Sequence, residues 1–309
     1  MKINKALKVI FLLLILFLMI GCSNSEKKDD HNKSHQKVYK NLNLTILIDL
    51  SDRISEKKNP GQVKNDLKLI NSILMLFKNY LTQKGVVNSE DKIKVIYYPQ
   101  INNDSLNSII DSLNIDFSDM LFNQRKRIFN LLEVIFNQNL TKVYNLASRM
   151  PEYPGSDLFN YFKHRIVDDC IIDDNNYLNI LVILTDGYIY HENAKYRKGN
   201  RFSYLGPKAN QVAIFRNHPN WEKIFDEQDY GLINTEAELS NLYIIAAQFN
   251  PISFSPQDFD IMKKYWSKWF EEQKLKKGNY KILRNDNPIL NISIIQKFFN
   301  KIIMDNTLH

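Results

Sequence analysis

The sequence predicts an α/β fold in which a doubly wound, mostly parallel central sheet is flanked by helices. Three observations lead to this prediction. Short apolar runs recur along the chain, amphipathic segments separate them, and polar clusters follow several of the runs. Parallel strands that are covered on both faces appear as nearly continuous apolar runs. Because strands and helices alternate, one doubly wound domain with right-handed crossovers is favoured.

The first segment, residues 1–21, is predicted to be a lipoprotein signal peptide. Three lysines come first, and an uncharged apolar run over 9–21 follows. That run is too short to cross a bilayer of about 30 Å as a stable helix, but it suits a secretion signal. The stretch MIGC at 19–22 resembles the lipobox of bacterial lipoproteins, whose cysteine, here Cys22, is acylated, as with palmitate. An uncleaved anchor is the alternative, and it gives the same compartment.

Residues 22–37 are predicted to be the lipidated cysteine and a flexible tether. Positions 23–37 hold no aliphatic residue and no Phe, Tyr or Trp, so they bury too little surface to offset their ordering entropy. Several acyl chains on Cys22 would give durable membrane attachment. We therefore expect a lipid-anchored, extracytoplasmic protein on a bacterial cell membrane, with one domain over 38–309.

The charge of the chain argues against a nucleic-acid partner. Loss of residues 1–21 removes three lysines and no acid, so the formal net charge falls from +7 to +4. The remaining positive charge is mild and forms no concentrated basic stripe of the kind that phosphate-backbone binding needs. We expect no nucleic-acid partner.

The elements of the domain are predicted from periodicity. Strong strand signals lie at 44–50, 178–184 and 242–247, weaker ones at 93–98 and 280–283, and a short edge strand at 112–118. Helical periods cover 63–81, 124–147, 157–167, a helix from Ser255 onward and 292–303. Ser255 and Pro256 suit the cap and first position of their helix. An insertion around 188–240 fits no minimal version of the fold.

Polar clusters follow two of the strong strands and precede one helix. Asp49 and Ser51 follow the first strand, Ser156 and Asp157 open the helix at 157–167, and Asp186 follows the strand at 178–184. Ligands of open parallel sheets bind beyond the carboxyl ends of the strands, where strand order reverses. Carboxylate and hydroxyl oxygens are the ligands that a hard cation such as Mg²⁺ prefers. These five residues are therefore a candidate site for Mg²⁺ or Mn²⁺.

Three short motifs also carry a resemblance to a family. ILIDLSDR at 46–53, GSDLF at 155–159 and ILTDG at 183–187 resemble the von Willebrand factor A (vWA) domain with its metal-ion-dependent adhesion site. The resemblance implies a Rossmann-like three-layer fold, a bound Mg²⁺ or similar ion, and in some members an acidic group from a protein partner. On that basis Asp49 and Ser51 match the first aspartate and serine of the motif. Asp186 matches the later aspartate, which often binds through water.

This chain departs from the motif at two positions. Arg53 stands where the second serine belongs, and Ser156 or Asp157 stands where a threonine belongs. A guanidinium has no lone pair to give, so Arg53 is not a ligand. In one arrangement Asp157 replaces the missing oxygen while Arg53 turns outward or pairs with Asp52. In the other, Arg53 lies between Asp49 and Asp157 as a built-in cation and no metal binds.

Each of these residues also has an ordinary structural explanation. Asp49 and Ser51 are of the types that turn the chain after a strand, and Ser156 and Asp157 suit a helix N-cap. In the insertion, Tyr188, Tyr190 and His191 are candidate partner-binding residues together with Arg53, because Tyr and Arg anchor many interfaces. The alternative there is a hairpin whose aromatic side chains fold back on the domain.

The sequence thus predicts a membrane-anchored binding or adhesion protein that engages a protein partner at this rim of the sheet. We expect no covalent chemistry. The alternative is an Mg²⁺-dependent phosphoester hydrolase on a doubly wound fold. That chemistry calls for a second aspartate two residues after Asp49, where this chain has Ser51. A Ser hydrolase would need a Gly-x-Ser-x-Gly elbow, which the sequence lacks.

Overall fold

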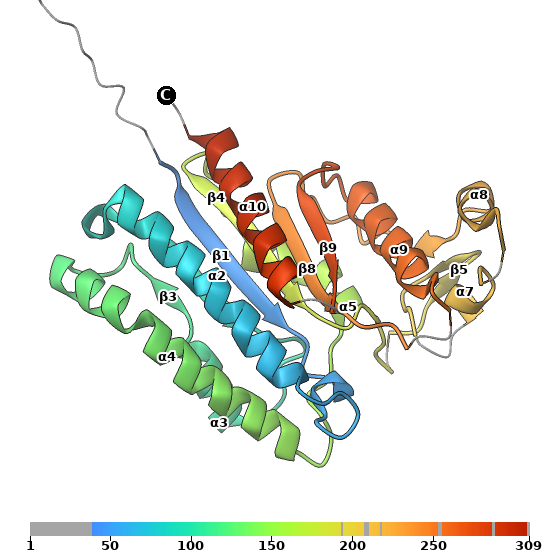
Figure 1. Cartoon of the computed structure of the whole chain (residues 1–309), viewed down its shortest axis with the longest axis horizontal. Helices are drawn as coiled ribbons and strands as arrows, with labels where there is room; N and C mark the ends of the chain where they lie inside the picture. Colours follow the sequence, from blue (N-terminus) through green and yellow to red (C-terminus); the bar gives the residue numbers. More distant parts are fainter. Residues whose placement is uncertain are drawn as a thin grey trace, which may run out of the picture. The chain divides into compact units, whose positions relative to one another are not determined.

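A six-stranded sheet with strand order β3-β2-β1-β4-β8-β9 runs through the centre of the protein (Figure 1). The computed structural model describes residues 39–307, apart from 193, 207–209, 217, 253–254 and 286–287. The strands are β1 (Asn41–Ile48), β2 (Lys92–Ile96), β3 (Ile115–Asp116), β4 (Tyr177–Leu184), β8 (Tyr243–Phe249) and β9 (Tyr280–Arg284). The four neighbouring pairs from β2 to β9 are all parallel, and β3 is antiparallel to β2. The sheet is therefore mixed.

Helices α2, α4 and α10 cover one face of the sheet, and α3 packs beside α4 (Figure 1). Alternate residues of β1, from Leu42 to Ile48, point to this face and join a hydrophobic cluster with these helices. Phe77 of α2 and Phe136 of α4 are completely buried in that cluster. The bounds are α2 (Gln62–Lys84), α3 (Asp104–Asp111), α4 (Phe122–Arg149) and α10 (Pro288–Asn306).

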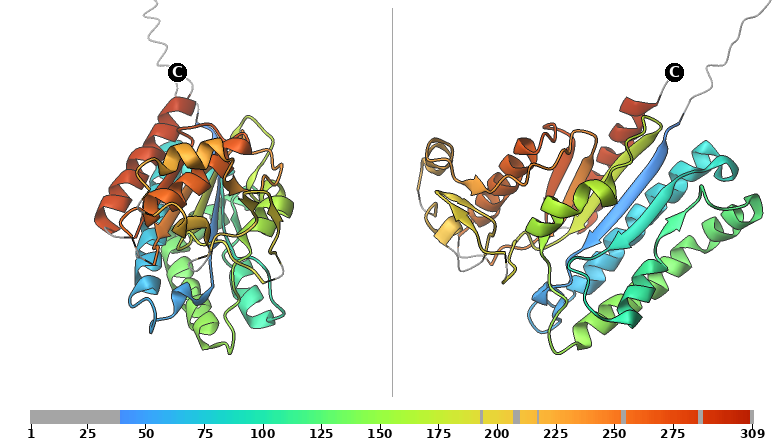
Figure 2. Two further views of the ribbon diagram at one scale, coloured as in Figure 1. Left: turned by 90° about the vertical axis from the view of Figure 1, so that its right-hand side faces the viewer. Right: turned by 180° about the vertical axis from the view of Figure 1, so that it is seen from behind.

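Helices α5 (Leu158–His164), α6 (Ile166–Cys170) and α9 (Asp258–Glu272) contribute to a second hydrophobic cluster with the opposite side chains of the strands. Leu47 of β1 and Leu181 of β4 belong to it, in register with the period of two that separates the faces of a strand. Trp266 and Trp269 of α9 fill its centre. Figure 2 shows this side of the sheet in its right-hand view.

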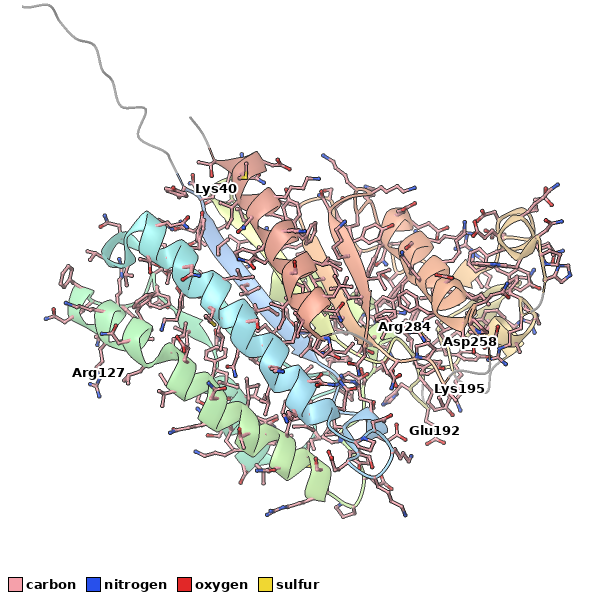
Figure 3. All side chains as sticks on the ribbon, in the orientation of Figure 1. Lys40, Arg127, Glu192, Lys195, Asp258 and Arg284 are labelled. Carbon is pink, nitrogen blue, oxygen red and sulfur yellow. The ribbon has the colours of Figure 1, made fainter. Side chains whose placement is uncertain are left out.

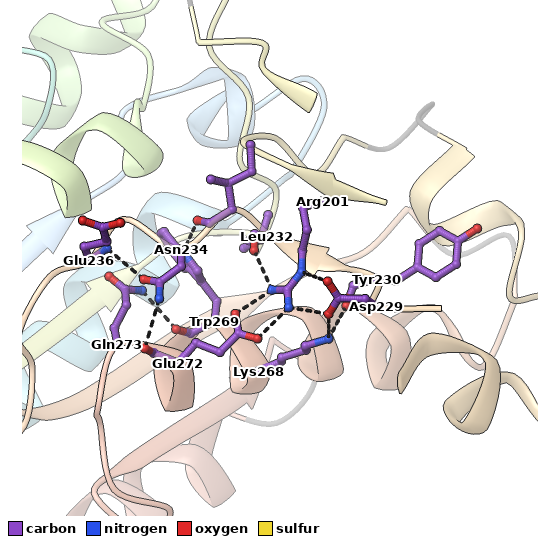
Figure 4. Close-up of polar contacts among 11 residues, drawn as sticks. Arg201, Asp229, Tyr230, Leu232, Asn234, Glu236, Lys268, Trp269, Glu272 and Gln273 are labelled. Carbon is purple, nitrogen blue, oxygen red and sulfur yellow. Dashed lines mark hydrogen bonds and ion pairs between the residues drawn. The ribbon is translucent and has the colours of Figure 1, made fainter. Parts of the chain in front are cut away.

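The insertion forms a small three-stranded sheet of order β5-β6-β7. Its elements are β5 (Arg197–Lys198), β6 (Arg201–Phe202), α7 (Asn210–Ala213), α8 (Trp221–Glu227) and β7 (Gly231–Leu232). The Arg201 guanidinium pairs with Asp229 of the insertion and with Glu272 of α9 (Figure 4). Lys268 of α9 also donates to Asp229 at 3.1 Å, so these contacts connect the insertion to α9. The hairpin that was the alternative interpretation of this region has a counterpart in the antiparallel pair β5 and β6.

The mixed α/β architecture and the predicted strands are confirmed, with boundaries shifted by a few residues. Two predicted helices differ. The helix at 157–167 divides at Arg165 into α5 and α6. Ser255 and Pro256 are not helical, since they form a turn before α9 in which Ser255 Oγ accepts a hydrogen bond from the Gln257 N–H at 3.3 Å. The single-turn helices η1 (Asp52–Ile54) and η2 (Val86–Asn88), together with α3, were not expected.

Both ends of the described chain lie at the end of the sheet where β1 begins. Tyr39 precedes β1, and α10 ends close to it (Figures 1 and 3). Lys40 marks this end in Figure 3, whereas Glu192 and Lys195 of the insertion lie toward the other. The predicted signal peptide, the lipidation of Cys22 and the tether lie outside the described residues. Within 39–307, gaps excepted, no helix combines the length and the apolarity that crossing a bilayer requires.

Candidate functional site

Strand order reverses between β1 and β4. From β1 the chain proceeds to β2 and β3 on one side, and from β4 it proceeds to β8 and β9 on the other. The loops that follow β1 and β4 therefore leave the same rim of the sheet side by side. The backbone keeps them together, because Asp49 N–H donates to Leu184 O at 3.0 Å.

Asp49 is held in one orientation at this rim. Its side chain is buried, and Oδ1 accepts from Ser51 N–H at 2.9 Å while Oδ2 accepts from the Thr185 hydroxyl at 3.0 Å. Burial raises the pKa of Asp49, and the charge of Arg53 and these hydrogen bonds partly oppose that rise. Asp49 thus closes the turn after β1, and its burial in the fold disfavours ionisation of its carboxyl group.

Asp186 is the second carboxylate of the rim. Its Oδ1 accepts from Tyr188 N–H at 3.0 Å, which closes the turn after β4. Burial raises its pKa to about 7, and the negative charge of neighbouring Asp49 contributes to the rise. The predicted approach of Asp49 and Asp186 is therefore what the structure shows, and the pair lacks enough nearby positive charge to hold both side chains ionised.

Arg53 is committed to a different carboxylate. The guanidinium is buried and forms a bidentate ion pair with Asp66 of α2, at 2.8 and 2.9 Å. Its Nη1 also donates to the backbone oxygen of Asp49 at 3.1 Å. Burial alone would lower the pKa of Arg53, but the Asp66 carboxylate raises it above its usual value. Asp66 also accepts from Gln62 Nε2 and the Tyr144 hydroxyl, each at 2.9 Å.

This network corrects both expected arrangements of Arg53. Arg53 does not turn outward and does not pair with Asp52, which pairs with Lys58 instead. It also does not lie between Asp49 and Asp157 as their shared cation, because Asp66 takes its two-pronged contact. Asp66 was not expected as the partner of Arg53, because it lies inside the helical period of α2.

Ser156 and Asp157 lie near each other in sequence but play different parts. Gly155 forms a bridge to Leu50, which brings Ser156 to the rim. Asp157 caps α5, accepting from the Asn160 N–H at 3.1 Å and from Asn160 Nδ2 at 2.7 Å. Its second neighbour is His191, whose Nδ1 lies 3.4 Å from Asp157 Oδ2. Asp157 and His191 thus face each other and do not line the pocket of Asp49 and Asp186.

A pocket of about 980 Å³ opens at this rim. Four of its residues, here called the acidic group, are Asp49, Ser51, Ser156 and Asp186. Arg53 and the ion pair of Lys58 with Asp52 also line the pocket. A second set, here called the tyrosine group, consists of Tyr188, Tyr190, Tyr204 and Ile252. Tyr188 and Ile252 are joined by a 2.9 Å hydrogen bond from the Ile252 N–H to the Tyr188 hydroxyl oxygen. Tyr190 and Ile252 are each 52% exposed, so this group presents apolar surface to solvent.

Gly187 fixes the loop between the two groups. Its φ of +91° belongs to the left-handed region, and a Cβ there would lie 2.3 Å from Met262 Sδ and 2.6 Å from Phe249 Cδ1. The Gly187 carbonyl accepts from Trp266 Nε1 at 2.8 Å. Only glycine meets both the conformation and the space, so α9 holds the turn that carries Asp186.

The acidic group fits a small hard cation. It offers two carboxylates and two hydroxyl oxygens, and Mg²⁺ is commonly bound by one or two carboxylates while it keeps several waters. A cation would also oppose the rise in the pKa of Asp186, which burial and the negative charge of Asp49 cause. Across residues 39–307, outside the gaps, no three His, Cys, Asp or Glu side chains form a ligand cluster. Any ion here would therefore depend on hydroxyls and water as well as carboxylates.

Comparisons with known proteins give structural likeness only. No protein-family model and no curated protein matches the chain. The solved structures found include the pilus adhesin SpaC from Lactobacillus rhamnosus GG, with 11% identity, 87% of this chain and 31% of that chain covered, and a TM-score of 0.42. A mutant of the PilB minor pilin from Streptococcus sanguinis has 11% identity, coverages of 87% and 62%, and a TM-score of 0.42.

A third structure is the proximal thread matrix protein 1 from the mussel byssus, with 8% identity, coverages of 85% and 48%, and a TM-score of 0.35. The chain thus covers between 31% and 62% of the length of these three proteins.

These findings contradict the resemblance to the vWA family. No family model matches, and the sheet is mixed because β3 is antiparallel to β2. At two positions of the motif the side chains also have other roles than binding an ion, since Arg53 pairs with Asp66 and Asp157 caps a helix. The site must therefore be judged on its own residues.

Proposed function

We propose that this protein is an extracytoplasmic, lipid-anchored binding protein with an adhesion-type role, and that it engages a protein partner at the rim pocket with the help of a divalent cation. One observation carries the proposal. Asp49 is a buried carboxylate and Asp186 a half-buried one, both line the pocket, and the Arg53 guanidinium at this rim is already paired with Asp66.

The residues of the pocket divide the work. Asp49 and Asp186 would hold Mg²⁺ or Mn²⁺, with the hydroxyls of Ser51 and Ser156 as further oxygen donors. The cation would supply positive charge at the pocket, where a partner's carboxylate or carbonyl oxygen has room to approach. Thr185 keeps the Asp49 carboxylate in place through its 3.0 Å hydrogen bond.

The tyrosine group would provide the apolar part of the contact. Tyr190 and Ile252 are half exposed, and exposed aromatic side chains beside a pocket are common anchors of protein interfaces. Tyr190 is also held in place by Lys195, whose Nζ lies 4.7 Å from the ring centroid. His191, expected among the partner-binding residues, faces Asp157 and stays a proposal at the margin of this surface.

The position of the pocket suits a tethered protein. Ligand sites of open sheets lie where the strand order reverses, and here it reverses between β1 and β4. Tyr39, where the domain begins, lies at the opposite end of β1 from Asp49. A tether over 22–37 that is anchored at Cys22 would therefore join the domain at the end remote from the pocket.

A thermal-shift titration tests the cation. The full-length protein in detergent is melted at increasing Mg²⁺ or Mn²⁺, and we expect Tm to rise because the ion binds the folded state. At an ion concentration of 100 times Kd the gain is about 2.7 kcal/mol. Asp49→Asn should abolish the shift. The matched control is Asp305→Asn, which removes an exposed carboxylate from α10. An unchanged Tm for the wild type at all concentrations would remove the cation from the proposal.

A hydrolysis assay separates binding from catalysis. If the rim were the active site of a phosphoester hydrolase, the protein with Mg²⁺ would cleave a generic phosphoester, and Asp49→Asn would stop it. We expect no turnover above buffer, because position 51 carries a serine rather than the second acid that such chemistry uses. Turnover that Asp49→Asn removes would replace the binding function with an enzymatic one.

A further inference from the structure

Strand β9 forms one edge of the six-stranded sheet. Its inner side pairs with β8 in parallel, and among the described residues no strand pairs with its outer side. An edge of this kind presents a row of backbone N–H and C=O groups that can pair with another chain. Which groups point outward follows from the pairing with β8.

The ladder directs Tyr280 and Ile282 outward. Ile244 N–H donates to Asn279 O at 2.9 Å, so Asn279 faces β8. In a parallel ladder, residues alternate between bonding to one neighbour and facing the other side. Lys281 therefore faces β8 as well, and the N–H and C=O groups of Tyr280 and Ile282 point to the free edge.

A trough runs along this edge. Its volume is about 760 Å³, and it lies between β9, the turn at Gly278 and the outward face of α9. Residues four apart on α9, such as Lys263 and Ser267 or Lys264 and Lys268, line one wall, as expected for neighbours on a helix surface. Tyr280 joins strand and helix, since its hydroxyl donates to Glu271 Oε1 at 2.6 Å.

The trough is basic. Its lining contains five lysines and three carboxylates. Two of the carboxylates already form ion pairs. Asp226 pairs with Lys264 at 2.8 Å. Glu272 pairs with Arg201 at 2.6 Å (Figure 4). Lys263 and Lys277 are exposed on either side. Lys264 and Lys268 already pair with Asp226 and Asp229, and Lys281 lies over the Phe298 ring. A ligand that enters the trough therefore meets outward-facing backbone groups on one side and the ammonium groups of Lys263 and Lys277.

We propose that the free edge of β9 is a second binding site, and that its ligand is an extended, acidic segment of a partner protein. The segment would add a strand to the sheet by pairing with the backbone of Tyr280 and Ile282, and its carboxylates would pair with the lysines of the trough. Backbone pairing supplies affinity and side-chain pairing supplies selectivity in this mode of recognition. The site is separate from the rim pocket.

Peptide binding with hydrogen exchange tests this proposal. The probe is a fluorescent, end-capped repeat of Glu-Val, added to the full-length protein in detergent at low salt. We expect saturable binding, and slowed exchange of the Tyr280 and Ile282 amides. Lys263→Glu combined with Lys277→Glu should weaken binding on the order of tenfold, because each replaces an attraction to the peptide's carboxylates with a repulsion.

Two controls separate pairing from simple charge attraction. A Glu-Val peptide with alternate backbone amides methylated keeps its charge but loses half of its donors, and it should bind at least about tenfold more weakly. Lys126→Glu combined with Lys142→Glu, two exposed positions on α4, should leave binding unchanged.

Three results would overturn the proposal: no binding of the Glu-Val peptide, equal binding of the methylated peptide, or binding without protection of the Ile282 amide. Asp49→Asn should leave peptide binding intact, so failure at this edge and failure at the rim pocket are distinguishable.

Discussion

Two buried carboxylate sites lie close to each other in this protein and differ in how their charge is balanced. Asp66 has a two-pronged partner in Arg53 and accepts further hydrogen bonds from Gln62 and Tyr144. Asp49 and Asp186 have backbone and hydroxyl donors, and the charge of Arg53 acts on both. Among the described residues, neither carboxylate forms an ion pair. The fold thus completes one carboxylate site and leaves the other short of positive charge, which marks the second as the place for a ligand.

The largest expected effect breaks the completed site. Asp66→Ala leaves the Arg53 guanidinium buried without its partner, so the free energy of unfolding should fall by about 3–5 kcal/mol. Urea denaturation measures the change. The double variant Arg53→Met with Asp66→Leu should recover most of the loss, because it leaves no buried charge unpaired. A loss below about 1 kcal/mol for Asp66→Ala would show that this network does not hold the rim together.

The next effect concerns the incomplete site and pH. The pKa of Asp186 is about 7 in the folded protein and starts from 3.8. The folded state therefore binds more protons than the unfolded state between these values, so stability should fall as pH rises from about 4 to 7 and stay low above that. At 1.36 kcal/mol per unit, the fall is about 2–4 kcal/mol after allowance for solvent.

Asp186→Asn should flatten this part of the pH profile. Urea melts at several pH values without divalent ions measure it, with Asp111→Asn on the surface of α3 as the control. Equal slopes for the wild type and Asp186→Asn would mean that Asp186 titrates in its ordinary range.

A smaller effect concerns the turn that positions Asp186. Gly187→Ala should cost about 2–3 kcal/mol, because it adds overlap with Met262 and Phe249 to the strain of a positive φ. Gly85→Ala is the matched control. Its φ is +96° but nothing lies within 4 Å of the added Cβ, so it should show the backbone strain alone. Equal losses in thermal or urea unfolding would contradict the close contact with α9.

The smallest effect separates the tyrosine group from the acidic group. Tyr190→Ala removes a half-exposed ring, so the free energy of unfolding should stay within about 0.5 kcal/mol of the wild type. The Mg²⁺-dependent rise in Tm should also persist, since Tyr190 contributes no ligand. A lost rise would place Tyr190 among the residues that hold the ion.

Much of the fold was predictable because strands buried on both faces leave a plain signal. The runs at 44–50 and 178–184 correspond to β1 and β4, and the polar residues after them do meet at one rim. The short elements of the insertion, such as β5 and β6, were not placed, since two-residue strands carry no periodicity. Their positions depend on tertiary contacts such as Arg201 with Glu272.

The electrostatics of the rim could not be read from the sequence. Arg53 was recognised as the residue that decides whether a cation has room, but its partner Asp66 lies 13 positions away on another element. Asp157 was grouped with the other rim acids as a candidate ligand. In the structure its carboxylate caps α5 instead. Distance in sequence hides which carboxylate an arginine neutralises, and that choice determines the character of the site.

The most direct test of the central claim, that Asp49 and Asp186 lack a positive charge which a divalent cation supplies, is a Mn²⁺ titration followed by electron paramagnetic resonance. Bound Mn²⁺ loses most of the sharp signal of the free ion. The account predicts one ion bound per chain at neutral pH, with binding lost in Asp49→Asn and in Asp186→Asn and kept in Asp305→Asn. A free-ion signal that is undiminished by the wild-type protein, or equally diminished by all three variants, would contradict it.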